Sequence, residues 1–153
     1  MKLSTRGDYG VRVVLELARA GRGAQLPAAE LADRCKVPQK YLGHLLLDLK
    51  AHGIVKSMRG PQGGFSLGRP ASEITVGEVV RVMDGPLAPI QCASRTAFAP
   101  CPQDRCQSEE TCVLRGLWLE VRDAISAIVD TVTFADLAAR PETPAAPRGT
   151  YAI

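Results

Sequence analysis

The chain of 153 residues has no long apolar run and few aromatic residues. No stretch approaches the roughly 20 apolar residues that a membrane-spanning helix requires, and the N-terminal MKLSTRGDYG lacks the apolar centre of a signal peptide. We therefore expect no membrane partner and a cytoplasmic location. Aromatic residues make up only 5% of the chain, so the core must be built mainly from aliphatic side chains.

Charge is distributed unevenly along the chain. Residues 1–69 contain twelve Lys or Arg and five Asp or Glu, a net +7, whereas residues 70–153 contain seven and eleven, a net −4. A basic N-terminal half is typical of a protein that lies on nucleic-acid phosphates, although a solvated basic face would give the same count. The length suits one packed head with an extension rather than two separate cores.

Three amphipathic helical patterns follow one another in the basic half. The first runs from Ser4 to Gly21, the second over residues 28–37 and the third over residues 39–53. Pro38 separates the second from the third, because the residue before a proline avoids helical geometry. Two helices joined by so short a turn predict a helix-turn-helix, whose second helix enters the major groove of DNA.

The pattern then changes from helical to extended. Residues 54–69, IVKSMRGPQGGFSLGR, place apolar positions on both sides of a Gly-rich turn and predict a β-hairpin, or wing, with a basic tip. Residues 72–85 predict one more short helix. We therefore expect a mainly α fold with a winged helix-turn-helix domain over residues 1–85.

The C-terminal half begins with a segment that lacks periodicity. Residues 86–112 collect four prolines and four cysteines, so we expect a loop that a bound ligand must order. Residues 113–132 carry an apolar stripe, which predicts a long helix that pairs with a second copy in a two-fold dimer. Folding back onto its own head is the alternative. A short helix capped by Thr133 completes a unit over residues 113–140, and residues 141–153 are expected to be a disordered tail.

Ten side chains are candidates for DNA contact. At the start of the third helix, Gln39 and His44 are candidates for base edges, and Lys40 and Tyr41 for bases or phosphates. We expect Arg59 of the wing tip in the minor groove, Gln62 beside it as a further DNA contact, and Lys2, Ser4, Thr5 and Arg6 on backbone phosphate. His44 alone would be an ordinary surface histidine, and its place on this helix makes it a candidate.

Four of the five cysteines lie in one window and form a second candidate site. They are Cys92, Cys101, Cys106 and Cys112, separated by eight, four and five residues. Cytosolic disulfides are rare, so this group predicts a metal site or a redox switch. Structural zinc sites usually pair ligands two to four residues apart, and the looser spacing favours an iron–sulfur cluster over zinc or a thiol switch. Cys35, far away in a helical pattern, is expected to be a small buried hydrophobe.

No pattern in the sequence supports catalysis. The two histidines have no Ser, Cys or carboxylate partner that the sequence can place, and RGPQGG is neither a P-loop nor a dinucleotide fingerprint. We therefore expect a binding protein rather than an enzyme. An iron–sulfur carrier that docks an acidic protein on its basic face is a rival, and the helix-turn-helix pattern counts against it.

Several segments together resemble one family, the Rrf2 family of bacterial regulators. The resemblance covers roughly residues 1–138 and is carried by MKLSTRGDYGVR, KYLGHLL, RGPQGGFSLGR, ITVGEVV and CVLRGLW. It implies a homodimeric winged-helix regulator, a repressor in the first place, with crossing C-terminal helices and one cluster per subunit near the interface. It further implies affinity for a DNA operator that changes when the cluster senses iron, redox state or nitric oxide.

The resemblance assigns three cluster ligands and leaves the fourth open. The family's ligand cysteines fall on Cys92, Cys106 and Cys112. Members of the IscR type have a histidine where this chain has Arg115, which cannot ligate iron. Members of the NsrR type use an N-terminal aspartate of the other subunit; Asp8 matches it, although it could equally be a first-turn helix carboxylate. Cys101 competes for this role, and the set favours a four-iron cluster, with a two-iron cluster as the alternative.

Overall fold

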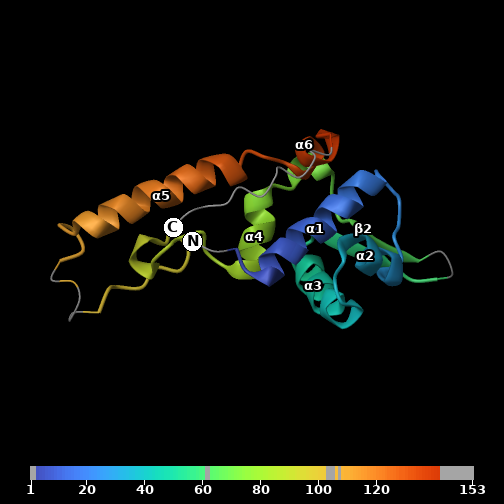
Figure 1. Ribbon diagram of the computed structural model, residues 1–153, viewed down its shortest axis with the longest axis horizontal. Helices are drawn as coiled ribbons and strands as arrows, with labels where there is room; N and C mark the ends of the chain where they lie inside the picture. The colour runs from blue at the N-terminus through green and yellow to red at the C-terminus, as the bar shows by residue number, and fades with distance from the viewer. Residues whose placement is uncertain (1–2, 61–62, 103–105, 107, 142–153) are drawn as a thin grey trace, which may run out of the picture.

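The computed structural model describes residues 3–60, 63–102, 106 and 108–141, and shows a mainly helical chain with one small hairpin (Figure 1). This is the predicted fold class. The elements in order are α1 (Thr5–Ala20), α2 (Ala28–Cys35), α3 (Gln39–Ala51), β1 (Val55–Met58), β2 (Gly64–Leu67), η1 (Ala71–Glu73), α4 (Val76–Asp84), η2 (Gln91–Ala93), α5 (Val113–Val129) and α6 (Phe134–Ala139).

Local sequence signals explain the helix-turn-helix. The Ser4 hydroxyl accepts the Gly7 N–H at 3.1 Å and caps α1, which ends at Gly21 with a φ of 90°. Between α2 and α3, Lys36 adopts a left-handed φ of 54°, Val37 turns into the core and Pro38 stands at the start of α3. The predicted order of helix, tight turn and second helix is confirmed.

The wing is a two-stranded antiparallel hairpin. Val55 pairs with Leu67 and Met58 with Gly64, which leaves the Gly-rich turn at the tip. Leu26, from the connection between α1 and α2, forms a bridge to Phe65 on the outer side of β2. The hairpin is therefore anchored to the helical part through β2, and its two strands run side by side (Figure 1).

One aliphatic core holds the head together, as the scarcity of aromatic residues predicted. Its completely buried side chains come from α1, α2, α3, the hairpin and α4, and include Val13, Leu31, Leu49, Ile54 and Val79. Phe134, the first residue of α6, is also fully buried in this core, and a capping box formed by Thr133 and Asp136 begins the helix. The short terminal helix thus belongs with the head, whereas the sequence grouped it with the long helix before it.

The long helix α5 projects away from the head (Figure 1). It ends at Val129, three residues earlier than predicted, and Arg122 is its only buried residue. Leu114, Leu117 and Ile128 of the predicted apolar stripe are 65%, 49% and 65% exposed, so the stripe is not folded back onto its own head. None of the helices among the described residues is long and apolar enough to span a membrane.

The segment before α5 is more ordered by protein contacts than the sequence suggested. Leu87, Cys92, Ala93 and Ser94 are buried, and η2 packs against α5. Contacts with α5 thus hold the first part of residues 86–112, and the expectation that a bound ligand orders the segment stays a prediction. A short apolar patch within a Pro-rich segment was enough to dock it on the neighbouring helix.

Candidate DNA-binding face and cysteine loop

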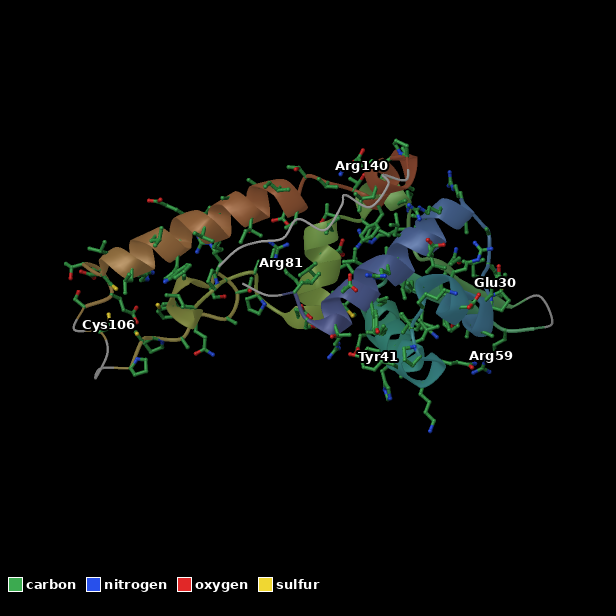
Figure 2. The ribbon with its side chains drawn as sticks, in the orientation of Figure 1. Glu30, Tyr41, Arg59, Arg81, Cys106 and Arg140 are labelled. Carbon is green, nitrogen blue, oxygen red and sulfur yellow. The ribbon has the colours of Figure 1, made fainter. Side chains whose placement is uncertain are left out.

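The N-terminal end of α3 presents a polar surface. Gln39, Lys40 and His44 are exposed, as a helix that enters a groove requires. Tyr41 is half-buried and packs edge-on against Tyr9 of α1, with ring centroids 5.8 Å apart and planes at 73°. Figure 2 shows Tyr41 on the side of the head opposite α6. The tyrosine pair fixes the angle between α1 and the start of α3.

Two of the predicted phosphate contacts at the start of α1 already have partners within the chain. The backbone N–H of Ser4 donates to Asp84 at 2.9 Å, and its hydroxyl donates to the same carboxylate. Arg6 forms an ion pair with Asp48 of α3 at 2.6 Å. Thr5 is exposed, and Lys2 lies outside the described residues. For Ser4 and Arg6, phosphate binding would have to compete with these internal contacts.

The wing contributes one described cation at its tip. Arg59 is exposed and forms no ion pair within the described part of the chain (Figure 2). Gln62 lies outside the described residues. At the base of the wing, the Lys50 ammonium donates to the Ser57 hydroxyl at 2.9 Å, which joins the end of α3 to β1. This hydrogen bond holds the hairpin next to the C-terminal end of α3.

The cysteine loop lies at the far end of α5 from the head (Figure 2). Cys92 is buried, the other three loop cysteines are half-buried, and all are free thiols. The Cys106 and Cys112 thiols lie close enough for each to shift the pKa of the other. Cys112 stands at the first position before α5, where the backbone N–H of Arg115, then that of Leu114, lower the pKa of its thiol.

The donor set of the loop fits a thiolate-bound centre. Burial and then the charge of Cys101 raise the pKa of Cys92, and Cys101 also acts on Cys106, so these sulfurs lie within electrostatic range of one another. Within residues 3–60, 63–102, 106 and 108–141, no three ligand side chains are gathered tightly enough to enclose an ion. The loop supplies four thiol donors, but the described residues do not bring three ligands close enough together to bind one ion.

Two arginines fasten the loop to α5. Arg115 donates through Nε to the Cys92 carbonyl at 2.9 Å, and Arg122 donates through Nη1 to the Ala93 carbonyl at 2.7 Å. Arg122 is also paired with Asp123 at 2.7 Å, so its buried guanidinium is neutralised. Arg115, which cannot ligate iron, therefore holds the backbone of a cysteine in place.

The other end of α5 is tied to α4 of the head. Arg81, labelled in Figure 2, donates two hydrogen bonds to the Asp130 carboxylate, at 2.6 and 2.8 Å. This contact lowers the pKa of Asp130 and raises that of Arg81. Gly77 permits the approach, because a Cβ there would lie 2.0 Å from an Asp130 oxygen. Helix α5 thus connects the cysteine loop to the head through short polar contacts.

Comparison with known proteins now identifies the chain. Residues 3–140 match the model of the Rrf2 family, described as "Iron-dependent Transcriptional regulator". The chain belongs to the Rrf2 family of transcriptional regulators. The resemblance drawn from the sequence motifs is therefore confirmed, and so is the expectation of a regulator that binds DNA.

Similar proteins fall into more than one group of Rrf2 regulators. An rrf2-like HTH-type regulator of Rhodobacter capsulatus is 38% identical over 140 residues, covering 90% of this chain and 92% of the relative. The regulator CymR of Bacillus subtilis is 33% identical, covering 90% of each. Its structure, titled the global cysteine regulator, matches with a TM-score of 0.73, 30% identity and coverage of 93% and 99%. A T. potens IscR structure matches with a TM-score of 0.69, 30% identity and coverage of 90% and 85%.

Asp8 and Cys35 of this Rrf2 chain both lie away from the cysteine loop. Asp8 lies on α1, paired with Arg12 at 2.9 Å, rather than in the cysteine loop of its own chain. Cys35 is buried in the head, where burial raises its pKa to about 11, in keeping with a structural role.

Sequence reasoning missed two residues of the loop region. The Glu109 carboxylate accepts the Cys101 N–H at 2.8 Å, and its place between two cysteines was the available signal. The role of Arg122 was not predicted either, although its spacing of seven from Arg115 places both on one face of α5.

Proposed function

We propose that this chain is a homodimeric repressor that binds a two-fold operator with α3 and the wing, and that its loop holds an iron–sulfur cluster. Cys92, Cys106 and Cys112 would supply three ligands, and either Cys101 or Asp8 of the second subunit the fourth. When bound, such a cluster offers a centre that iron loss, oxidants or nitric oxide can change. The set favours a four-iron cluster, and a two-iron cluster remains the alternative.

One observation carries the proposal for the loop. Four free thiols lie in a single segment at the start of α5, and the backbone of the first is fixed there by Arg115. Thiolates are the ligands that iron–sulfur clusters use. The family description as iron-dependent supports this assignment.

The exposed stripe on α5 supports the dimer. Val113, Leu114, Leu117 and Ile128 expose apolar surface on a helix that projects from the head. Such a helix is stabilised when a second copy covers it, and two-fold pairing gives the commonest closed assembly. Two heads related in this way would present two α3 helices to the half-sites of a palindromic operator.

The chain offers a physical route from loop to head. Arg115 and Arg122 hold the Cys92 and Ala93 carbonyls on α5, and Arg81 holds Asp130 near its other end. Because α5 is one continuous helix, a change in how the loop is held alters the angle at which α5 meets α4. We propose that this angle sets the separation of the two α3 helices.

The test compares anaerobically isolated protein with protein from which iron has been removed. Operators are first selected from a pool of random duplexes with the isolated protein, and affinities of both forms are then measured for the selected sequence. We expect visible charge-transfer absorbance, iron and acid-labile sulfide in the first form, and at least a tenfold difference in operator affinity. Colourless protein whose DNA affinity ignores iron would contradict cluster sensing.

Single substitutions separate the ligands. Cys92→Ala, Cys106→Ala and Cys112→Ala should lose bound iron, whereas Cys35→Ala, outside the loop, should keep it. Cys101→Ala and Asp8→Ala distinguish the two fourth-ligand assignments, since only the true ligand changes the Mössbauer or resonance Raman spectrum. If Cys35→Ala loses iron as readily as the loop variants, the assignment to the loop fails.

A second function for the same loop is favoured by the closeness of the Cys106 and Cys112 thiols, each of which shifts the pKa of the other. In metal-free protein, hydrogen peroxide would oxidise both thiols to a disulfide. The thiols lose two electrons and two protons, and the peroxide is reduced to two molecules of water. Mass spectrometry after peroxide treatment would show the loss of two hydrogens in metal-free protein. Zinc in protein purified without oxygen would instead support a structural metal site.

A further inference from the structure

A cavity of about 350 Å³ lies in the head, outside both sites described above. Its walls come from the end of α1, the turn that follows it, the base of the hairpin, η1 and α6. Two glycines of the turn, Gly21 and Gly23, have φ values of 90° and 85° and leave this wall without side chains. The volume suits a small molecule rather than a macromolecule.

The charged side chains that line the cavity are all cationic. They are Arg22, Lys56 and Arg69, and no carboxylate belongs to the described lining. Arg69 is held in place by the Glu73 carbonyl, at 2.6 Å, and by the Glu78 carboxylate. Arg22 and Lys56 form no ion pair within the described part of the chain, so their charges are not neutralised by neighbours.

The cavity opens on a different face from the recognition helix. Ser57 receives a hydrogen bond from Lys50 of α3, and successive side chains of a strand point to opposite faces, so Lys56 points away from α3. No residue of α3 or of the wing tip lines the cavity. DNA bound to α3 would therefore leave it open.

We infer that this cavity binds a small, multiply charged oxyanion, such as a phosphate compound or a di- or tricarboxylate. Arg22 and Lys56 would contact the anion from the α1 turn and from β1, while Arg69 stays paired with Glu78 in the wall of the cavity. The apolar walls, among them Pro70 and Ala135, would contact its carbon skeleton. The ligand would join the wing base to α6, and it would do so independently of the cysteine loop.

The test is a titration of the uniformly ¹⁵N-labelled full-length protein with inorganic phosphate and, separately, with citrate, at constant ionic strength set by chloride. We expect saturable amide shifts concentrated at residues 21–23 and 68–72. The tighter of the two probes identifies phosphate or carboxylate chemistry. Arg22→Gln and Lys56→Gln should each weaken binding about tenfold, the factor expected for one charge-assisted hydrogen bond.

The matched control is Lys40→Gln, which removes the same charge from a cation with no ion pair and leaves the cavity intact. Its phosphate affinity should equal that of the unmodified chain. Ser72→Glu adds a carboxylate to the lining and should also weaken binding, while unchanged amide spectra away from the cavity show that each variant keeps its fold. Shifts that are scattered, unsaturable or equally reduced in Lys40→Gln would reveal general charge screening and overturn the inference.

A DNA role for the same cations is the other result that would overturn it. If Arg22→Gln and Lys56→Gln lower affinity for a selected operator without added anion as strongly as Lys40→Gln does, the lining belongs to the DNA surface. Unchanged operator affinity together with lost phosphate binding is the expected outcome. Neither readout depends on iron, so failure here and failure of the proposed cluster are distinguishable.

Discussion

The head and the arm of this molecule differ in how completely one chain builds them. We use head for residues 3–85 with α6, and arm for the cysteine segment with α5. The head buries aliphatic side chains from α1, α2, α3 and α4, and its fully buried set includes Leu31, Leu49 and Ile74. On α5 only Arg122 is buried, and large apolar side chains face solvent.

This difference separates two kinds of stability. The free energy of folding of the head comes from apolar burial within one chain, so the head should fold without a partner subunit or a bound ligand. The arm exposes apolar side chains of α5 that a second chain would cover, and it carries thiols that would bind a metal centre. Its structure should therefore depend on partner concentration and on bound ligand, as expected for binding linked to folding. A regulated element has to be of this second kind if a signal is to change it.

The largest effect should follow from opening a cavity in the head. Leu49 of α3 is completely buried, and Leu49→Ala should lower the free energy of unfolding by about 2–5 kcal/mol. Leu47 on the same helix is 66% exposed, so Leu47→Ala is the matched control and should change it by less than about 0.5 kcal/mol. Guanidinium unfolding at fixed protein concentration measures both. Equal losses would show that the head is not the independently packed unit.

The arm should fail by dissociation rather than by unfolding. Leu117→Glu places a charge in the exposed stripe of α5 and should weaken the dimer at least about 100-fold, because an unpaired charge would be buried at its interface. Gly116→Glu adds the same charge on another face of α5, where a Cβ meets nothing within 4 Å, and should leave the dimer intact. Analytical ultracentrifugation decides between them. A monomeric Gly116→Glu would place the interface elsewhere on the helix.

The fold of the head was predictable because its signals are local. Ser4, Pro38 and the Gly-rich wing turn each mark a boundary by backbone chemistry alone, and the apolar spacing between them assigns the buried faces. The clustering of cysteines likewise needed no structure. What the sequence did not indicate was the docking of Cys92 and Ala93 on α5, because it depends on arginines 23 and 29 residues further along.

Contacts between distant segments account for the remaining differences. Arg6 and Ser4 look available for phosphate in the sequence, yet their partners Asp48 and Asp84 are 42 and 80 residues away. Similarly, α6 joins the core of the head because the Phe134 N–H donates to the Ile74 carbonyl at 3.0 Å. Periodicity reports which face of a helix is apolar, and it does not report what that face meets.

The junction between head and arm should give an intermediate effect. Gly77→Ala forces a methyl group against the Asp130 carboxylate and Val129, so α5 must shift; we expect a loss of about 1–3 kcal/mol in unfolding free energy. Gly43→Ala lies in open space on α3 and should instead gain about 0.5–1 kcal/mol, since alanine favours the helix. Thermal and guanidinium unfolding measure both. A neutral Gly77→Ala would mean that the close approach of α4 and α5 is dispensable.

The smallest effect should come from the ion pair at the same junction. Arg81 and Asp130 are 35% and 40% exposed, so solvent screens them, and Asp130→Asn should cost less than about 1 kcal/mol at pH 7. The pKa of Asp130 lies below its ordinary value of 3.8 in the folded chain. Its contribution is therefore fully present above that value and is lost as the pH falls through the lower, folded pKa.

Unfolding curves of the unmodified chain and of Asp130→Asn should thus converge in acid and separate towards neutral pH. Arg81→Gln should reproduce the neutral-pH loss, and the double variant should lose little more, because one interaction has been removed twice. A difference that persists unchanged below the folded pKa of Asp130 would mean that the substitution disturbs packing around Gly77 instead. In that case shape rather than charge joins the arm to the head, and the junction should be insensitive to salt.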